Sequence, residues 1–309
     1  MPEVRYPIIP ADERVRKLNH PGRKVRMVLD TDTFNEIDDQ FAVVYALHSP
    51  DSVQVEAFYA APFFNSLSTG PLDGMEKSYN EIVKILGILK REDIPVYRGS
   101  DRYLAGPNAP TESDAARNLV ERAMSSDPSD PLYVLSIGAI TNVASAILME
   151  PRIIERIVVV WLGGHALHWP DTREFNLHQD IHAARVVFDS GVPVVLAPCM
   201  GVASHLQTTL SEIEDYVKDS GPIGAYLHET YRNCADDHYG YSRVIWDIAV
   251  VAWLIDPEWC PSVVVPSPRV SEDARWIHDP TRHPIRSFYY IHRDKVFKDL
   301  FRKVAAGRA

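Results

Sequence analysis

Short apolar runs alternate with stretches of helical spacing along most of the chain. The apolar runs have the length and the β-branched content of buried strands. They cover residues 27–29, 53–61, 94–97, 132–137, 153–162 and 192–197. Apolar residues recur at helical spacing in residues 41–47, 76–89 and 115–125, and again after the turn at residue 138. This alternation predicts an α/β fold, with an open, mostly parallel sheet and helices on both of its faces.

The chain becomes more helical past residue 200. Helical spacing is found in residues 210–217, 223–231 and 248–255. Residues 266–309 predict a last strand and a terminal helix with a solvated face. Residues 1–24 are polar and punctuated by proline, so we expect an arm on the surface or on a neighbouring subunit. We see no internal repeat and no low-complexity linker, and we therefore expect a single domain over residues 1–309.

Composition narrows the functional classes. With 309 residues, of which 46% are hydrophobic, the chain can bury a large core. A net charge of −10 argues against nucleic-acid binding by a general basic surface. No apolar run approaches the length of a membrane span, and the N-terminus lacks the apolar core of a signal peptide. The three cysteines are far apart and show no zinc spacing. We therefore expect a cytoplasmic protein that binds neither nucleic acid nor membrane.

Four carboxylates crowd the turn between the first strand and the next helix. The stretch DTDTFNEIDD carries Asp32, Glu36, Asp38 and Asp39 on this turn, with Asp30 at the end of the strand. Parallel sheets bind ligands at the carboxyl ends of their strands, which is where this turn lies. Such a density of negative charge favours a bound cation, and Ca²⁺ and Mg²⁺ prefer oxygen ligands. The alternative is that Asp38 and Asp39 only cap the helix, but a cap needs a single acid.

Five separate stretches, in the same order along the chain, resemble the inosine/uridine-preferring nucleoside hydrolases. They are DTDTFNEIDD, which is similar to the family's D-x-D-P-G-x-D-D signature; Asn65 after the second strand; LSIGAITNVA; Gly163-Gly164 followed by Glu174-Phe175-Asn176; and Trp246-Asp247, where the family usually has His-Asp. The resemblance implies that the protein hydrolyses the N-glycosidic bond of a ribonucleoside to free base and ribose.

The resemblance also implies a Ca²⁺ site. Its ligands would be the side chains of Asp32, Asp39 and Asp247 and the main-chain carbonyl of Ile137. The ion would lower the pKa of a bound water and fix the ribose hydroxyls beside it. Asp32 would be the general base that takes a proton as this water attacks the sugar.

Contacts with the sugar are implied around this ion. The residues expected to bind the ribose, or to lie near the attacking water, are Asp38, Asn65, Glu174 and Asn176. Asn35 and Glu36 belong to a turn that is longer than the common form of the signature. They either add sugar contacts or close the space around the hydroxyls. His165 and His168 either line the pocket or lie on a surface loop.

Trp246 occupies the position where many members of the family have a histidine that protonates the leaving base. An indole cannot be a general acid at neutral pH. Either Trp246 stacks on a purine, or it belongs to the core and the acid comes from a residue just upstream. The candidate acids are His238, Tyr239, Tyr241 and Arg243. We favour a contact with the base, and hence a purine ribonucleoside as the substrate.

Two other functions compete with this interpretation. VLDTDTF also resembles the nucleophile strand of haloacid-dehalogenase-type phosphatases, in which Asp30 would attack phosphorus and Asp32 would be the acid/base. That scheme needs a second acidic pair after a late core strand, and Asp236-Asp237 follows no apolar strand. The other possibility is a non-catalytic Ca²⁺/sugar-binding protein of the same fold. Members of the family are commonly homodimers or homotetramers, so self-association is implied by the resemblance alone.

Overall fold

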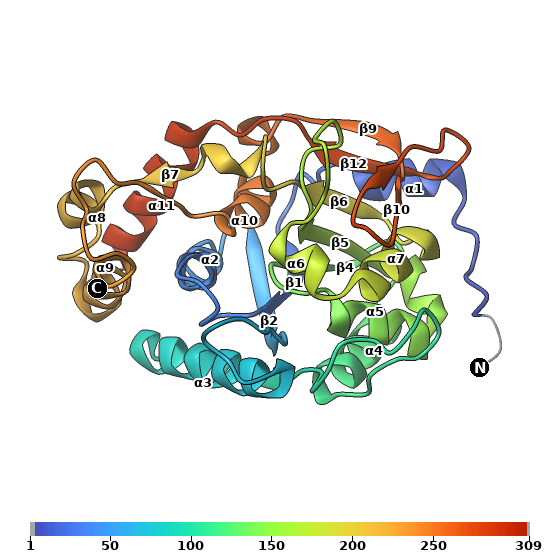
Figure 1. Ribbon diagram of the computed structural model, residues 1–309, viewed down its shortest axis with the longest axis horizontal. Helices are drawn as coiled ribbons and strands as arrows, with labels where there is room; N and C mark the ends of the chain where they lie inside the picture. The colour runs from blue at the N-terminus through green and yellow to red at the C-terminus, as the bar shows by residue number, and fades with distance from the viewer. Residues whose placement is uncertain (1–3, 308–309) are drawn as a thin grey trace.

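An eight-stranded sheet runs through the middle of the protein, and helices cover both of its faces (Figure 1). The computed structural model describes residues 4–307. The strand order is β3-β2-β1-β4-β5-β6-β12-β9, and neighbouring strands are parallel except for β12 and β9. The strands are β1 (Val25–Thr31), β2 (Val53–Ala60), β3 (Val96–Arg98), β4 (Leu132–Ser136), β5 (Ile157–Leu162), β6 (Val194–Ala197), β9 (Ser262–Pro266) and β12 (Pro284–Phe288). The predicted α/β fold is confirmed.

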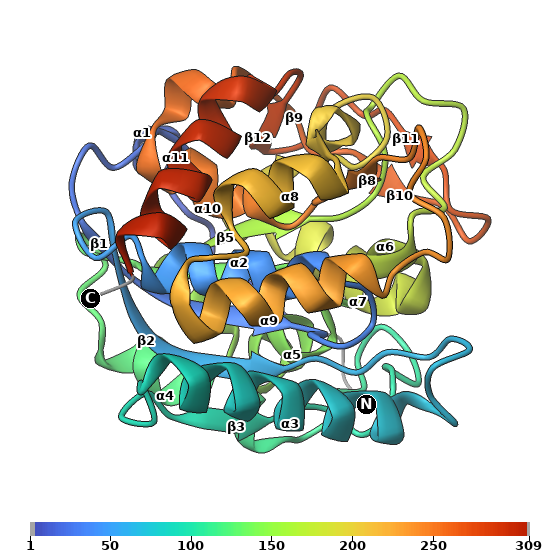
Figure 2. The same cartoon turned by 90° about the vertical axis from the view of Figure 1, so that its left-hand side faces the viewer.

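The helices form two layers, one on each face of the sheet. The first layer, which faces the viewer in Figure 2, contains α2 (Asp38–Leu47), α3 (Pro71–Leu89), α8 (Leu210–Tyr216), α9 (Gly221–Arg232), α10 (Ile248–Ile255) and α11 (Arg293–Ala306). The second contains α4 (Asp114–Ser125), α5 (Thr141–Met149) and α7 (Ile181–Ser190). Side chains alternate along β5: Val158 and Val160 join the first apolar core, and Val159 and Trp161 join the second. No helix within residues 4–307 combines the length and the apolar character that a membrane crossing requires.

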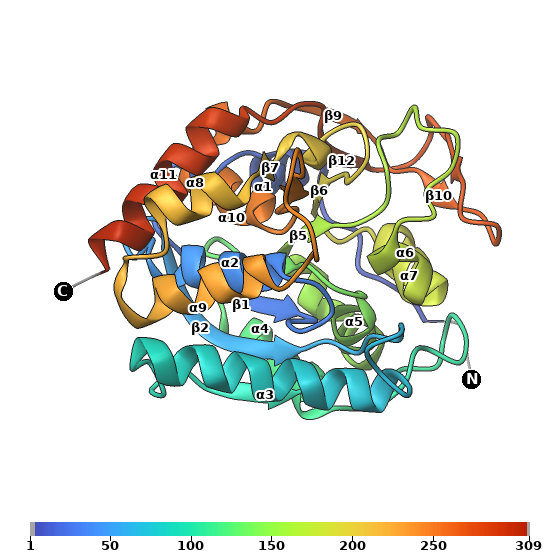
Figure 3. The same ribbon diagram turned by 60° about the vertical axis from the view of Figure 1, so that its left-hand side comes forward.

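Several smaller elements lie outside the eight-stranded sheet. They are the short helix α6 (Phe175–Gln179), the hairpin of β7 (Gln207–Thr208) with β8 (Arg243–Val244), and the hairpin of β10 (Arg269–Val270) with β11 (Trp276–Ile277). Figure 3 shows α6 beside α7.

The order of the strands reverses beside β1. The chain runs from β1 outward through β2 to β3, and then returns to form β4 on the other side of β1. Successive connections therefore diverge at the carboxyl ends of β1 and β4, which is the position where open parallel sheets bind their ligands. Asp32 follows β1 and Ile137 follows β4, so the topology brings both residues to this position.

Several boundaries differ from the sequence prediction. Helix α2 begins at Asp38 rather than Phe41, because the two acids form its first turn. Helix α3 begins at Pro71 rather than Glu76, which agrees with the preference of proline for the first turn of a helix. Residues 151–155 form a 3₁₀-helix, so β5 is shorter at its start than predicted. The antiparallel edge strand β9 and the helices α6 and α7 were not predicted.

The segment expected to be an arm, residues 1–24, contains a helix that the sequence did not predict, within the part that the structure describes. Residues 11–18 form helix α1, whose Leu18 is fully buried. The buried side chains of Arg14 and Lys17 donate hydrogen bonds to backbone carbonyls of the main domain, at Gly191 and Glu155. The long stems of arginine and lysine can pack on apolar surface, so a polar composition did not reveal this docking. Residues 1–3 lie outside the described part of the chain.

Candidate active site

A cavity of about 250 Å³ opens at the carboxyl ends of the central strands. It is lined by Asp32, Asn35, Glu36, Asp38, Asp39, Ile137, Leu162, His165, Arg173, Glu174, Phe175, Asn176, Cys199, Met200, Trp246 and Asp247. These residues come from the connections after β1, β4, β5 and β6 and from the start of α10. The fold therefore brings together ten of the thirteen residues predicted for the site, and leaves Asn65, His238 and Tyr241 outside the lining.

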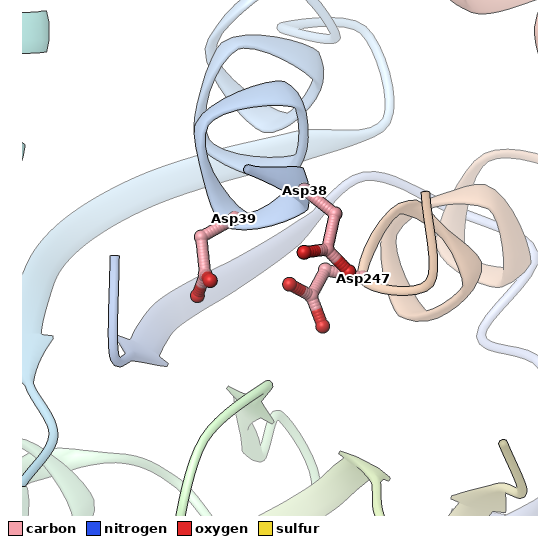
Figure 4. Close-up of side chains that lie close together, drawn as sticks. All are labelled: Asp38, Asp39 and Asp247. Carbon is pink, nitrogen blue, oxygen red and sulfur yellow. The ribbon is translucent and has the colours of Figure 1, made fainter. Parts of the chain in front are cut away.

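Three buried carboxylates form the most compact acidic cluster of the site. Asp38 and Asp39 lie in the first turn of α2, and Asp247 directly precedes α10 (Figure 4). One carboxylate oxygen from each lies within 4.8 Å of the others. Asp39 Oδ1 accepts a hydrogen bond from Thr31 Oγ1 at 2.5 Å, and Asp38 Oδ2 accepts one from the backbone N–H of Trp246 at 3.1 Å. The positive end of a helix dipole favours such acids, but it carries only about half a unit charge.

Asp32 adds a fourth carboxylate to the same cavity. It is buried, and its Oδ2 has no hydrogen-bond partner anywhere in residues 4–307. Burial, and then the charges of Asp39 and Asp38, raise the pKa of Asp32 well above its ordinary range. A buried carboxylate oxygen without a partner is costly, so this donor set fits a site that a bound group completes. Because the donors are all oxygen atoms, they fit Ca²⁺ or Mg²⁺ better than a softer metal.

The compact cluster consists of Asp38, Asp39 and Asp247. The sequence prediction had Asp32, and not Asp38, as the third metal ligand beside Asp39 and Asp247, and it assigned Asp38 to the sugar. Asp32 lines the cavity beside this cluster. The carbonyl of Ile137, the fourth predicted ligand, accepts a hydrogen bond from Asn176 Nδ2 at 3.1 Å and keeps a second lone pair. Which carboxylate binds the cation and which binds the sugar therefore stays a prediction.

Without bound cations, the protein is expected to lose stability as the pH rises from about 4 to about 7. Burial raises the pKa of Asp30 and that of Asp39 to about 7, from an ordinary value of 3.8. The folded state then holds protons that the unfolded state has already released, so the stabilisation is complete below pH ~4 and is lost as the pH passes ~7. Thermal melts in chelator across this range test the prediction, and Asp39→Asn should flatten the dependence. A melting temperature that rises steadily with pH, unchanged in the variant, would contradict it.

Glu174 and Asn176 are fixed by the protein and do not lie on a solvated loop. Glu174 caps α6, and its oxygens accept hydrogen bonds from three backbone N–H groups at 2.8–3.0 Å. Burial raises the pKa of Glu174 to about 6, although these backbone donors oppose the shift. Asn176 Nδ2 donates to the carbonyls of Ile137 and Leu162, both at 3.1 Å. Both side chains are therefore preorganised at the carboxyl ends of β4 and β5.

Three predicted residues lie away from the cavity lining. Asn65 is one step removed, because its Nδ2 donates to Asn35 Oδ1 at 2.5 Å. His238 contacts the backbone carbonyl of Arg232 at 2.9 Å, and Tyr241 lies edge-on to its ring. His238 and Tyr241 do not belong to the cavity lining, and their role as acids for the leaving base stays a prediction. Another candidate acid, Tyr239, is 95% exposed.

Several lining residues had no role in the sequence prediction. They are Leu162, Arg173, Phe175, Cys199 and Met200. His165, for which the sequence left a pocket and a surface loop equally open, also lines the cavity, whereas His168 does not belong to the lining. Cys199 and Met200 follow β6 and His165 follows β5, so their positions just past predicted strand ends were the available signal.

Asp30 lies beneath the cavity and not in its lining. Its two oxygens accept hydrogen bonds from Asn142 Nδ2 at 2.8 Å and from Ser136 Oγ at 3.0 Å. Ser136 and Asn142 belong to the LSIGAITNVA stretch, and Ser136 lies opposite Asp30 on the neighbouring strand β4. A fully buried carboxylate with both oxygens occupied is poorly placed to attack phosphorus, so the geometry argues against the phosphatase scheme.

Comparisons with known proteins agree with this architecture. Residues 27–286 match the family model described as inosine-uridine preferring nucleoside hydrolase. A pyrimidine-specific ribonucleoside hydrolase, RihA of Salmonella paratyphi B, is 29% identical over 250 residues, which are 72% of this chain and 77% of that protein. Two solved structures share the fold. A plant nucleoside hydrolase, PpNRh1, has a TM-score of 0.73 and 20% identity, over 93% of this chain and 100% of that one. A purine-preferring ribonucleoside hydrolase from Gardnerella vaginalis has a TM-score of 0.72 and 19% identity, over 92% and 99%. The family model covers most of the chain, and the protein therefore belongs to the inosine-uridine preferring nucleoside hydrolases, enzymes that hydrolyse N-glycosyl bonds.

Proposed function

We propose that this protein catalyses the Ca²⁺-dependent hydrolysis of purine ribonucleosides, with Asp32 as the general base. One observation carries the proposal: four buried aspartates face one cavity, and one oxygen of Asp32 has no protein partner among the described residues. The base is part of the proposal, because RihA is named as pyrimidine-specific and the Gardnerella protein as purine-preferring.

Bound Ca²⁺ would be held by carboxylates of this group, and it would supply polarisation of a water and coordination of the ribose hydroxyls. The free oxygen of Asp32 can accept the proton that the water loses as it attacks the sugar. The sugar gains positive charge as its bond to the base breaks, and the buried carboxylates stabilise that charge. Asp32 thus serves both as a proton acceptor and as an electrostatic partner of the transition state.

The ribose contacts follow from hydrogen-bonding capacity. Both donors of the Asn176 amide are used within the protein, so its oxygen is what it can offer to a sugar hydroxyl. Glu174 is ionised above its pKa of about 6. Its carboxylate accepts hydrogen bonds from three backbone N–H groups and retains lone pairs for one more donor. We expect these two residues to orient the sugar, while Asp38 accepts from a hydroxyl or binds the ion.

The purine preference rests on Trp246. This residue lines the cavity, and it also packs against the first apolar core, so it is held in place as a platform for a flat base. Trp246→Ala is expected to lower turnover of purine nucleosides by about 10- to 100-fold, because stacking of a base on an aromatic ring contributes about 1–3 kcal/mol. An activated nitrophenyl riboside, whose leaving group needs little assistance, should lose much less. Equal losses on both substrates would remove the leaving-group role of Trp246.

Release of ribose from a panel of purine and pyrimidine nucleosides, with and without chelator, tests the proposed function. We expect release that requires Ca²⁺ and is fastest on purines. A non-catalytic sugar-binding protein would bind nucleosides in the presence of Ca²⁺ and release nothing. A phosphatase would instead release phosphate from phosphomonoesters in the presence of Mg²⁺.

A further inference from the structure

The long acidic turn is tied to two segments that are distant in the sequence. Asn65, just past β2, donates from Nδ2 to Asn35 Oδ1 at 2.5 Å. Arg243, the first residue of β8, donates from Nη2 to Glu36 Oε2 at 2.6 Å across a sequence separation of 207 residues. Asn35 and Glu36, which belong to the stretch that makes this turn longer than the common signature, are therefore each bound to another part of the protein.

The backbone of the turn has a conformation that needs such support. Phe34 has a φ of 112°, a region that residues other than glycine rarely adopt. Within the turn, the backbone N–H of Asn35 donates to the carbonyl of Asp32 at 2.9 Å. Strained positions persist where surrounding contacts hold them, and they are common at functional sites. Asn35 and Glu36 directly follow Phe34, and their contacts with Asn65 and Arg243 hold its backbone in this conformation.

Arg243 is fixed on its own side of the contact. β8 pairs with β7, and the backbone N–H of Arg243 donates to the hydroxyl of Tyr231 at 3.1 Å. Three residues further on, the backbone N–H of Trp246 donates to Asp38 Oδ2 at 3.1 Å, and Asp247 follows directly. The segment that carries Trp246 and Asp247 thus meets the acidic turn at two points, one an ion pair and one a backbone hydrogen bond.

The ion pair also balances charge at the edge of the carboxylate cluster. Arg243 is partly buried, with 26% of its side chain exposed, so solvent screens its charge less than that of a fully exposed arginine. Glu36 lines the cavity, so the pair forms part of its wall. A guanidinium–carboxylate contact is directional as well as attractive, and it can therefore set a position.

We propose that Arg243 is a positioning residue: by binding Glu36, it holds Trp246 and Asp247 against the acidic turn, so that Ca²⁺ affinity and the fit of the nucleoside depend on this ion pair. The inference rests on the proposed function. Its effect on Ca²⁺ binding can nevertheless be measured without any turnover.

Calorimetric titration of Ca²⁺ into the full-length protein tests this role. Arg243→Gln and Glu36→Gln are each expected to weaken Ca²⁺ binding about tenfold, a coupling of ordinary size between linked sites. The double variant should lose no more than either single variant, because both substitutions break the same contact. Arg243→Lys keeps the charge and should recover part of the affinity. With each variant, the KM for a nucleoside should rise more than kcat falls.

The matched control is Arg26→Gln, which breaks the ion pair of Arg26 with Glu56 at the start of β1, the end of that strand away from the cavity. The side chains of that pair are 32% and 12% exposed, compared with 26% and 39% for Arg243 and Glu36. Its Ca²⁺ affinity should equal that of the wild type. Unchanged affinity in Arg243→Gln, or losses that add in the double variant, would overturn the inference while leaving the proposed function intact. If the wild type neither binds Ca²⁺ nor releases base, the proposed function fails and the inference fails with it.

Discussion

Asp32→Asn is expected to lower kcat by about 10²- to 10⁴-fold, the range over which a general base contributes to catalysis. The substitution keeps the size of the side chain and removes the proton acceptor. It also removes one of four buried carboxylates whose charges oppose one another. In chelator, the variant should therefore melt at a higher temperature than the wild type. Steady-state kinetics on a purine nucleoside and thermal melts of the same preparations measure the two effects.

The opposite signs of these two effects separate a functional role from a structural one. If Asp32 merely supported the fold, Asp32→Asn would lower both the melting temperature and the activity. Asp30→Asn offers the contrast. Asp30 accepts hydrogen bonds from Asn142 and Ser136, so replacing an oxygen with an amide nitrogen sets donor against donor. That variant should lose stability first, and activity only as a consequence. Activity of Asp32→Asn within tenfold of the wild type would exclude Asp32 as the base.

The parts of the site that the sequence predicted well are local in the chain. Asp32, Asp38 and Asp39 are separated by one turn, and a strand followed by a helix fixes where that turn lies. The parallel sheet followed from the alternation of apolar runs and helical stretches, because such a pattern has few other solutions. Asp247 was different. As a lone acid before an apolar helix it reads as a cap, and only the family resemblance linked it to the first turn.

The positions of loops that depend on tertiary packing could not be predicted from the local sequence. Arg173 carries no spacing that marks it as a cavity residue, and it reaches the site through the loop between β5 and α6. The pairing of Glu36 with Arg243 joins residues 207 positions apart, and nothing in either local sequence specifies it. His238 and Tyr241 were chosen because they precede Trp246 closely in the chain, and the structure leaves both outside the cavity lining.

Ca²⁺ is expected to stabilise the wild-type protein by about 4 kcal/mol at about a thousand times its Kd, because it binds the folded state alone. Asp247→Asn should abolish most of this gain. Burial, and then the charges of Asp38, Asp39 and Asp32, raise the pKa of Asp247 well above its ordinary range, so its charge is unfavourable without a cation. The variant should therefore be more stable than the wild type in chelator and less stable in Ca²⁺. Thermal melts over a Ca²⁺ series would show the two curves crossing.

Asp256→Asn is the matched control, because it changes an acid at the other end of the same helix. Asp256 caps the 3₁₀-helix that follows α10, and its Oδ1 accepts a hydrogen bond from the backbone N–H of Glu258 at 2.9 Å. Its substitution should cost no more than about 1 kcal/mol, the size of a cap, with or without Ca²⁺. The gain from Ca²⁺ should be the same as in the wild type. If both variants lost that gain equally, Ca²⁺ would be acting on the helix as a whole, and the carboxylates of α2 and Asp247 would not form one site.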